Sequence, residues 1–156
     1  MFTTQILVHD QTSNTLGLPA YHILPAFPKV GDIVELFDGR LFKVSHTTLK
    51  ASSKLGAVLD VPSCIVVAVD RGEGPTLKET EHAERRASFV RVIFWEPDGD
   101  LHRECSCSRT PVIGDHVDIV QDGQSSGFAF EVMELSGIKG FIVRKSRFER
   151  PVMAKT

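Results

Sequence analysis

Apolar and polar residues alternate along most of this chain, and that alternation is typical of β-strands with one buried face. In the region 127–135, for example, Phe128, Phe130 and Val132 fall on one side of an extended strand. The run CIVVAVD at 64–70 is instead almost continuously apolar, which indicates a strand buried on both faces. The pattern therefore predicts an all-β protein, with at most one short helix.

The clearest predicted element is a β-hairpin around Asp38–Gly39, which lies between two apolar runs and favours a two-residue turn. With that turn, Ile33 lies opposite Val44 and Glu35 lies opposite Phe42. This face carries more of the bulky apolar side chains than the other face does. It is the predicted core face.

Two segments share one pattern, namely PKVGDIVELFDGRLFKV at 28–44 and PVIGDHVDIVQDGQSSGFAFEV at 111–132. Each has a Gly-Asp turn ahead of a strand, at Gly31 and at Gly114, and the second segment has the longer hairpin loop. The repeat predicts two tandem, duplicated small β-barrels packed as one compact unit. The expected organisation is a first barrel repeat at 1–75, a linker or short helix at 76–87, a second barrel repeat at 88–150 and a tail at 151–156.

Three connections are expected between these strands. Thr76 and Glu79 have the spacing of a helix capping box, so residues 76–87 are the helical candidate, with mostly charged residues. Residues 50–59 are expected to be a loose linker. The stretch 21–28 contains two prolines and is expected to be an ordered connection, with Tyr21 and Phe27 pointing inward.

Composition limits the possible functions. The chain has 156 residues, and 18 Lys and Arg against 20 Asp and Glu give a net charge of −2, which provides no general attraction to nucleic acid or to anionic lipid. A secretory leader and an apolar run long enough to cross a membrane are both missing from the sequence, so the expectation is a cytoplasmic protein without a membrane partner. Its three cysteines do not suggest a disulfide framework.

The second repeat resembles the bacterial form of the Src-homology-3-like small barrel. The similarity rests on GDHVDIV, GFAFEVMEL and GIKGFIVRKSRF, in which Gly137, Gly140, Phe141 and Val143 occupy the positions of that family's closing strand. Phe141 stands where Trp is usual. The duplicated cradle-loop barrel, which also has a Gly-Asp turn in each half, is the rival resemblance. Either one implies a barrel that binds peptides, glycans or nucleic acid through its loops, and neither assigns a catalytic residue or a cofactor.

One cluster could support metal or cysteine chemistry. Thiolates and imidazoles are zinc ligands, and four such residues occur within a short stretch: His102, Cys105, Cys107 and His116. A cysteine nucleophile would need a histidine base beside it, but residues three apart on a strand face opposite sides. Small buried thiols beside a polar histidine are the alternative, and it is the one favoured here, so no metal or cofactor is expected.

The end of the chain is basic. Lys139, Arg144, Lys145, Arg147, Arg150 and Lys155 stand against Glu149 alone, while residues 115–134 contain acidic residues and no Lys or Arg. These charges either pair across neighbouring strands or form a basic edge that contacts phosphates or an acidic partner. In Phe94–Trp95 the two rings must face opposite sides of a strand, so one ring is expected to be exposed or to cover an open barrel end.

These observations favour a non-enzymatic module that binds another macromolecule through barrel loops or an edge strand, and a protein is the favoured partner. The first alternative is a nucleic-acid-binding module that uses the basic C-terminal strand. The second is a small metal-dependent or cysteine enzyme. The expected binding residues are Arg144, Lys145, Arg147, Arg150, Trp95, Tyr21 and Phe27, and the oligomeric state is open.

Overall fold

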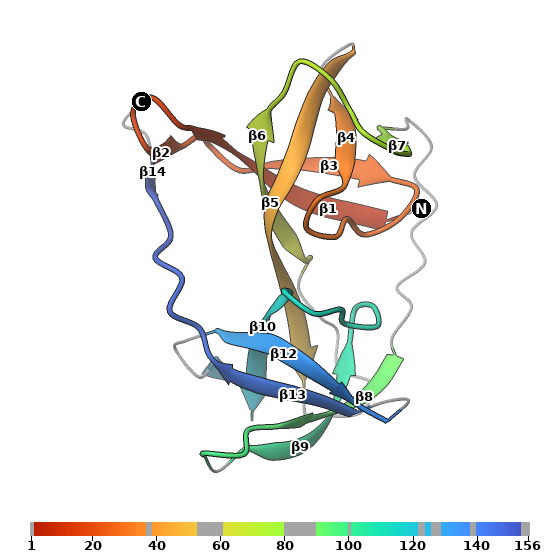
Figure 1. The fold of residues 1–156 in the computed structure, drawn as a ribbon, viewed down its shortest axis with the longest axis vertical. Coiled ribbons are helices and arrows are strands. Elements are labelled where there is room, and N and C mark those ends of the chain that lie inside the picture. The colour runs from red at the N-terminus through yellow and green to blue at the C-terminus, as the bar shows by residue number, and fades with distance from the viewer. Residues whose placement is uncertain are drawn as a thin grey trace. The chain divides into compact units, whose positions relative to one another are not determined.

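The computed structural model describes residues 2–36, 39–52, 61–79, 90–99, 101–121, 124–125, 129–137 and 140–153, and within them every regular element is a β-strand (Figure 1). The predicted all-β class is therefore confirmed. The chain divides into two compact units. The first unit consists of residues 1–47, 61–86 and 148–156, and the second unit of residues 48–60 and 87–147. In the described part of the chain, no helix is long and apolar enough to cross a membrane.

The first unit is built around one sheet with the strand order β3, β1, β6, β5, β4, β7. A small second sheet continues from β1 through β2 to β14. The strands of this unit are β1 (Phe2–Asp10), β2 (Thr15–Leu16), β3 (Ala20–Leu24), β4 (Ile33–Leu36), the first part of β5 (Arg40–Ser52), β6 (Ser63–Ala68), β7 (Thr76–Lys78) and β14 (Val152–Met153).

The central strand of this sheet is β6, which lies between β1 and β5. Cys64 and Val66 pack into one apolar cluster and Ile65, which alternates with them, packs into another. The continuous apolar run at 64–70 predicts a strand that is buried on both faces. The two clusters on opposite sides of β6 confirm that prediction.

The β4–β5 hairpin forms, but in a different register from the predicted one. Val34 pairs with Phe42 and Leu36 pairs with Arg40, so three residues connect the strands instead of two. Gly39, the last of the three, has a φ of 106°, which a side chain would strain. A shift of one residue in the pairing register moves the side chains of a strand to the opposite face of the sheet. Val34 and Leu36 are therefore buried with Phe42 and Val44. Of the predicted core face, Ile33, Phe42 and Val44 are buried, and the prediction was wrong for Glu35, which is only half-buried.

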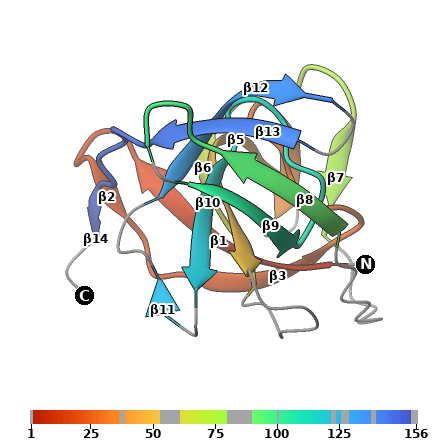
Figure 2. The same ribbon diagram turned by 90° about the horizontal axis from the view of Figure 1, so that it is seen from below.

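The second unit contains a closed barrel of six strands, which can be followed in Figure 2. Its strands pair in the cyclic order β8, β9, β5, β10, β12, β13 and back to β8. Besides the end of β5, they are β8 (Val90–Trp95), β9 (His102–Cys107), β10 (His116–Gln121), β12 (Phe130–Ser136) and β13 (Gly140–Lys145), and β11 (Gln124–Ser125) pairs with β10 outside the ring.

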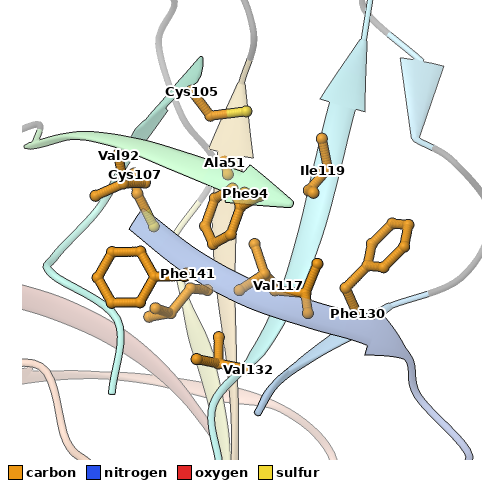
Figure 3. Close-up of a cluster of buried hydrophobic side chains, with 12 residues drawn as sticks. Ala51, Val92, Phe94, Cys105, Cys107, Val117, Ile119, Phe130, Val132 and Phe141 are labelled. Atoms are coloured by element: carbon orange, nitrogen blue, oxygen red, sulfur yellow. The ribbon is translucent and has the colours of Figure 1, made fainter. Parts of the chain in front are cut away.

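Alternate residues of all six strands fill the barrel. Phe94 and Phe141 lie at its centre with their ring centroids 6.1 Å apart (Figure 3). Around them are the other buried residues of the cluster: Leu49, Ala51, Val92, Cys105, Cys107, Val117, Ile119, Phe130, Val132 and Val143. These side chains come from strands far apart in the sequence, so the barrel core depends on the whole ring being closed.

One strand of this barrel is not part of the second repeat in the sequence. Residues 48–52, the end of β5, pair in parallel with β10 and antiparallel with β9, and they close the ring. Lys50, which was expected to begin a loose linker, lies in this strand and the expectation was wrong for 50–52; residues 53–60 lie outside the described part of the chain.

The direction of pairing corresponds between the two units. In the first unit β1 pairs antiparallel with β3 and parallel with β6, and β4 pairs antiparallel with β5 and parallel with β7. In the second unit β8 pairs in the same two ways with β9 and β13, and β10 with β12 and β5. This correspondence is what the sequence repeat predicts, while the duplication itself stays a prediction.

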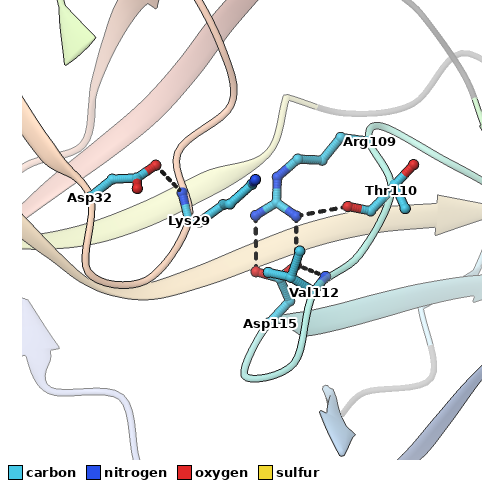
Figure 4. Close-up of polar contacts among 6 residues, drawn as sticks. All are labelled: Lys29, Asp32, Arg109, Thr110, Val112 and Asp115. Carbon is cyan, nitrogen blue, oxygen red and sulfur yellow. Dashed lines mark hydrogen bonds and ion pairs between the residues drawn. The ribbon is translucent and has the colours of Figure 1, made fainter. Parts of the chain in front are cut away.

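The two Gly-Asp turns also correspond. Gly31 has a φ of 94° and donates its amide to the carbonyl of Val44, and Gly114, with a φ of 97°, donates to Val132. In each turn the aspartate carboxylate accepts a backbone amide three residues earlier, as the sequence predicts (Figure 4).

Two connections differ from their predictions. Thr76–Lys78 form strand β7, which pairs with β4, so the helix predicted at 76–87 was wrong at its start. The rest of that prediction, from residue 80, lies outside the described part. Residues 20–24 form strand β3 instead of an irregular connection, because they pair with β1.

Candidate interaction surface

Among the described residues of the second unit, the exposed aromatic side chain is Trp95, at the end of β8. Phe94 is fully buried in the barrel, whereas 44% of Trp95 is exposed, because consecutive residues of a strand face opposite sides. The prediction that one of these two rings is exposed is confirmed. Trp95 is the only tryptophan of the chain, and an exposed tryptophan is the side chain most often found at the energetic centre of a protein interface.

The strand register places Trp95 in a row that crosses four strands. Trp95 pairs with His102 of β9 on one side and with Ile142 of β13 on the other, and Ile142 pairs with Glu134 of β12. Directly paired residues project to the same face of a sheet. Because Phe94 faces the core, all four of these side chains lie on the outer face of the barrel.

A second row runs beside the first. Ile93 is 39% exposed and pairs with Glu104 and with Gly140, which pairs in turn with Ser136. Gly140 leaves Ile93 uncovered on that side, and a side chain there would collide with the carbonyl of Ser136. We call these two rows the Trp95 surface. Its apolar centre is Ile93, Trp95 and Ile142, and its polar border is His102, Glu104, Glu134 and Ser136.

The border is more acidic than basic. The Glu104 carboxylate accepts a hydrogen bond from Nε of Arg91 at 3.3 Å. Glu134 is exposed and forms no ion pair within the described ranges. The turn after Trp95 adds Glu96 and Asp98, and it is held by a backbone hydrogen bond from the Glu96 amide to the Leu101 carbonyl.

The basic C-terminal residues are divided between the two units. Arg144 and Lys145 end strand β13 and Arg147 follows them, all three exposed, whereas Arg150 belongs to the first unit. Arg144 donates to Glu131 of the neighbouring strand at 3.4 Å.

A second acidic residue of the 115–134 stretch is also matched by a cation. The Lys50 ammonium lies 2.9 Å from the Asp118 carboxylate, and the two residues pair in register across β5 and β10. Pairing across strands with a basic C-terminal residue, one of the two explanations that the sequence left open, is therefore observed for Glu131, while Asp118 pairs across strands with Lys50.

The two aromatic residues expected near 21–28 differ from each other. Tyr21 lies on β3, is 66% exposed and so does not point inward, which corrects the prediction for this residue. The physical reason is strand alternation, since His22 and Leu24 take the buried positions. Phe27 is half-buried. Both residues belong to the first unit and not to the Trp95 surface.

The cysteine and histidine cluster does not converge. Cys105 and Cys107 are fully buried in the barrel core, His102 is exposed on the outer face, and His116 is buried on β10. Among the residues that the structure describes, no three His, Cys, Asp or Glu side chains are arranged to hold a metal ion. The sequence spacing suggested proximity, but strand alternation separates the imidazole of His102 from the thiols.

Burial also suppresses ionisation in this cluster. Desolvation raises the pKa of the Cys105 thiol to about 11 and that of the Cys107 thiol to about 12. Burial likewise lowers the pKa of His116, although the nearby carboxylates of Glu131 and Asp115 oppose that shift. The two cysteines are therefore neutral, apolar core residues near neutral pH.

A buried ion pair at the second Gly-Asp turn was not anticipated. Arg109 donates from Nη1 to Oδ2 of Asp115 at 2.5 Å and from Nη2 to Oδ1 at 2.9 Å (Figure 4). The Asp115 side chain is fully buried and that of Arg109 is 13% exposed. The first repeat has Ala26 at the position that corresponds to Arg109. This difference between the repeats was the signal in the sequence that could have pointed to the ion pair.

Two side-chain contacts of the first unit join segments that are distant in the sequence. Nδ1 of His22 on β3 lies 2.6 Å from the carboxylate of Glu79, just after β7, so a side-chain contact links the strands at the two ends of this sheet. The ring of Phe148 stacks on His46 of β5 with a centroid distance of 3.9 Å. These contacts hold the edges and the C-terminal segment of the unit.

Comparison of the chain with models of known protein families, with curated proteins and with solved structures gave no match.

Proposed function

We propose that this protein is a non-enzymatic interaction module that binds another protein through the Trp95 surface of its second unit. The single observation that carries the proposal is the exposure of Trp95 and Ile93 on the same outward face of strand β8. A tryptophan with an apolar neighbour and a polar border has the composition of an interface centre. A barrel wall also fixes these side chains before binding, which reduces the entropy lost on association.

The three cysteines support a cytoplasmic location for this activity, since all of them are free and buried. A catalytic role is not part of the proposal, because the thiols nearest to a histidine in the sequence lie in the core with raised pKa values.

The test is capture from the native lysate followed by measurement with the purified partner. Trp95→Ala is compared with the wild type, and Tyr21→Ala is the matched control, since it removes an exposed aromatic ring from the first unit. We expect Trp95→Ala to weaken the affinity measured by calorimetry by about ten-fold or more, and Tyr21→Ala to leave it unchanged. Equal affinities for the wild type and Trp95→Ala would remove the Trp95 surface from the proposal.

A nucleic-acid module is the second candidate, because three cations are exposed at the end of β13 and just after it: Arg144, Lys145 and Arg147. Replacing these three residues and Arg150 with Glu tests it. A nucleic-acid site requires that the wild type binds a short duplex or single strand with log affinity falling linearly in log salt, and that the variant loses this binding. If the wild type binds no nucleic acid and the folded variant keeps its protein partner, these cations only balance neighbouring carboxylates.

A further inference from the structure

We infer that the Trp95 surface recognises a basic segment of its partner, with a lysine or arginine placed against the Trp95 ring and its charge met by the carboxylates of the border. This inference rests on the proposed function and names the chemistry of the partner for the same surface.

The charge around Trp95 has an acidic excess. Glu134 lies in the same row as Trp95, and Glu96 and Asp98 lie in the turn that follows it. On the other side the carboxylate of Glu104 is matched by Arg91. The outward positions of these rows hold no further Lys or Arg, because the remaining members are His102, Ile142, Gly140 and Ser136. A partner that covers the surface must therefore supply positive charge or leave carboxylates without a counter-ion.

The geometry suits a long cationic side chain. Neighbouring strands are about 4.8 Å apart, so Glu134, two strands from Trp95 in one row, has its backbone about 10 Å from that of Trp95. The face of a tryptophan attracts an ammonium or guanidinium group more strongly than other rings do. Ile142 pairs with Trp95 on the neighbouring strand, and Ile93 lies two residues before Trp95 on the same face of β8. Both provide apolar surface for the methylene stem of a lysine or arginine.

The same charges disfavour nucleic acid at this surface. Binding to phosphates requires cations that displace the counterions of the backbone, and the carboxylates of Glu134, Glu96 and Asp98 would repel those phosphates. A nucleic acid bound by this protein would have to use another face.

The experiment uses the full chain and the fluorescence of its single tryptophan. The probes are a capped hexapeptide of alternating lysine and valine, the same peptide with glutamate in place of lysine, and a single-stranded oligonucleotide. Glu134→Lys places a positive charge in the row of Trp95. Glu73→Lys is the matched control, because it makes the same change in net charge at an exposed position of the first unit.

We expect the lysine peptide to change Trp95 fluorescence in a saturable way, and the glutamate peptide and the oligonucleotide to have no effect. Glu134→Lys should weaken binding of the lysine peptide by roughly two- to ten-fold, while Glu73→Lys leaves it unchanged. Binding that is equal for the two peptides, or unaffected by Glu134→Lys, overturns the inference. If the lysine peptide fails while a captured partner still depends on Trp95, the basic-segment inference is wrong and the proposed function stands; if the partner is also independent of Trp95, both fail.

Discussion

Replacing Arg109 with Met should destabilise the second unit by about 3–5 kcal/mol, because it leaves the carboxylate of Asp115 buried without its cation. The structure sets this magnitude. Asp115 is fully buried, and its carboxylate accepts two hydrogen bonds from the guanidinium and one from the amide of Val112 at 2.8 Å. An ordinary hydrogen bond contributes only about 1 kcal/mol net, so the buried charge supplies most of the loss.

The assay is urea unfolding followed by the fluorescence of Trp95, which reports on the second unit. With a slope of about 1 kcal/mol/M for a small unit, Arg109→Met lowers the midpoint by about 3–5 M, which would unfold a marginal unit. Arg109→Lys is therefore the second variant. It keeps the charge and loses the two-pronged contact, and a fall of about 1–2 M is expected for it.

The control is Asp32→Asn in the first Gly-Asp turn. Asp32 is half-exposed and its carboxylate accepts the Lys29 amide at 2.9 Å, a bond that the Asn side-chain oxygen can retain, so the expected cost is below about 1 kcal/mol. The double variant Arg109→Met with Asp115→Asn should be more stable than Arg109→Met alone. If Arg109→Met costs no more than Asp32→Asn, or if the double variant recovers nothing, the explanation by a stranded buried charge is refuted.

Three further predictions follow from the fold. Gly31→Ala and Gly114→Ala should each lower the free energy of unfolding, measured in urea, by about 1–2 kcal/mol, because a side chain strains a backbone with positive φ. No atom lies within 4 Å of an added Cβ at either position, so this loss comes from the backbone and not from a collision, and unchanged stability would contradict the prediction. Burial raises the pKa of the Cys64 thiol to about 12, that of Cys105 to about 11 and that of Cys107 to about 12. The three thiols should therefore react with Ellman's reagent at pH 8 only after unfolding, and fast reaction of the native protein would be the opposing result. The pKa of His116 is lowered in the folded protein, so as the pH falls below the ordinary histidine pKa of 6.5 the unfolded chain binds more protons than the folded chain does. Stability of the second unit should thus be full above that pH and decline as the pH falls toward the folded-state pKa, and His116→Gln should flatten this part of the urea-midpoint profile, whereas an unaltered profile would assign the decline to other groups.

Local patterns in the sequence were reliable where a single strand decides the outcome. The alternation at Phe94–Trp95 predicts one buried and one exposed ring, and the apolar run at 64–70 predicts a strand covered on both faces. The Gly-Asp turns follow from local chemistry as well, because a glycine with positive φ and an aspartate that binds a nearby amide need no distant partner.

Predictions that depend on a partner strand were less successful. The hairpin at Asp38–Gly39 was predicted, but its loop is one residue longer, which moved Val34 and Leu36 to the core instead of Glu35. Thr76–Lys78 have the capping pattern of a helix and yet form β7, because backbone hydrogen bonds to β4 outweigh a weak local preference. Tyr21 faces solvent because the pairing of β3 with β1 decides which side is buried.

The sequence by itself determined the all-β class, the strands with clear alternation, the two Gly-Asp turns and the exposure of one ring at 94–95, because these depend on residues close together in the chain. Only the tertiary structure decided that residues 48–52 close the second barrel, that Arg109 pairs with Asp115, and that Trp95 lies in a row with His102, Ile142 and Glu134. Each of these contacts joins strands or turns through register, and register depends on how distant hydrophobic faces meet in a common core.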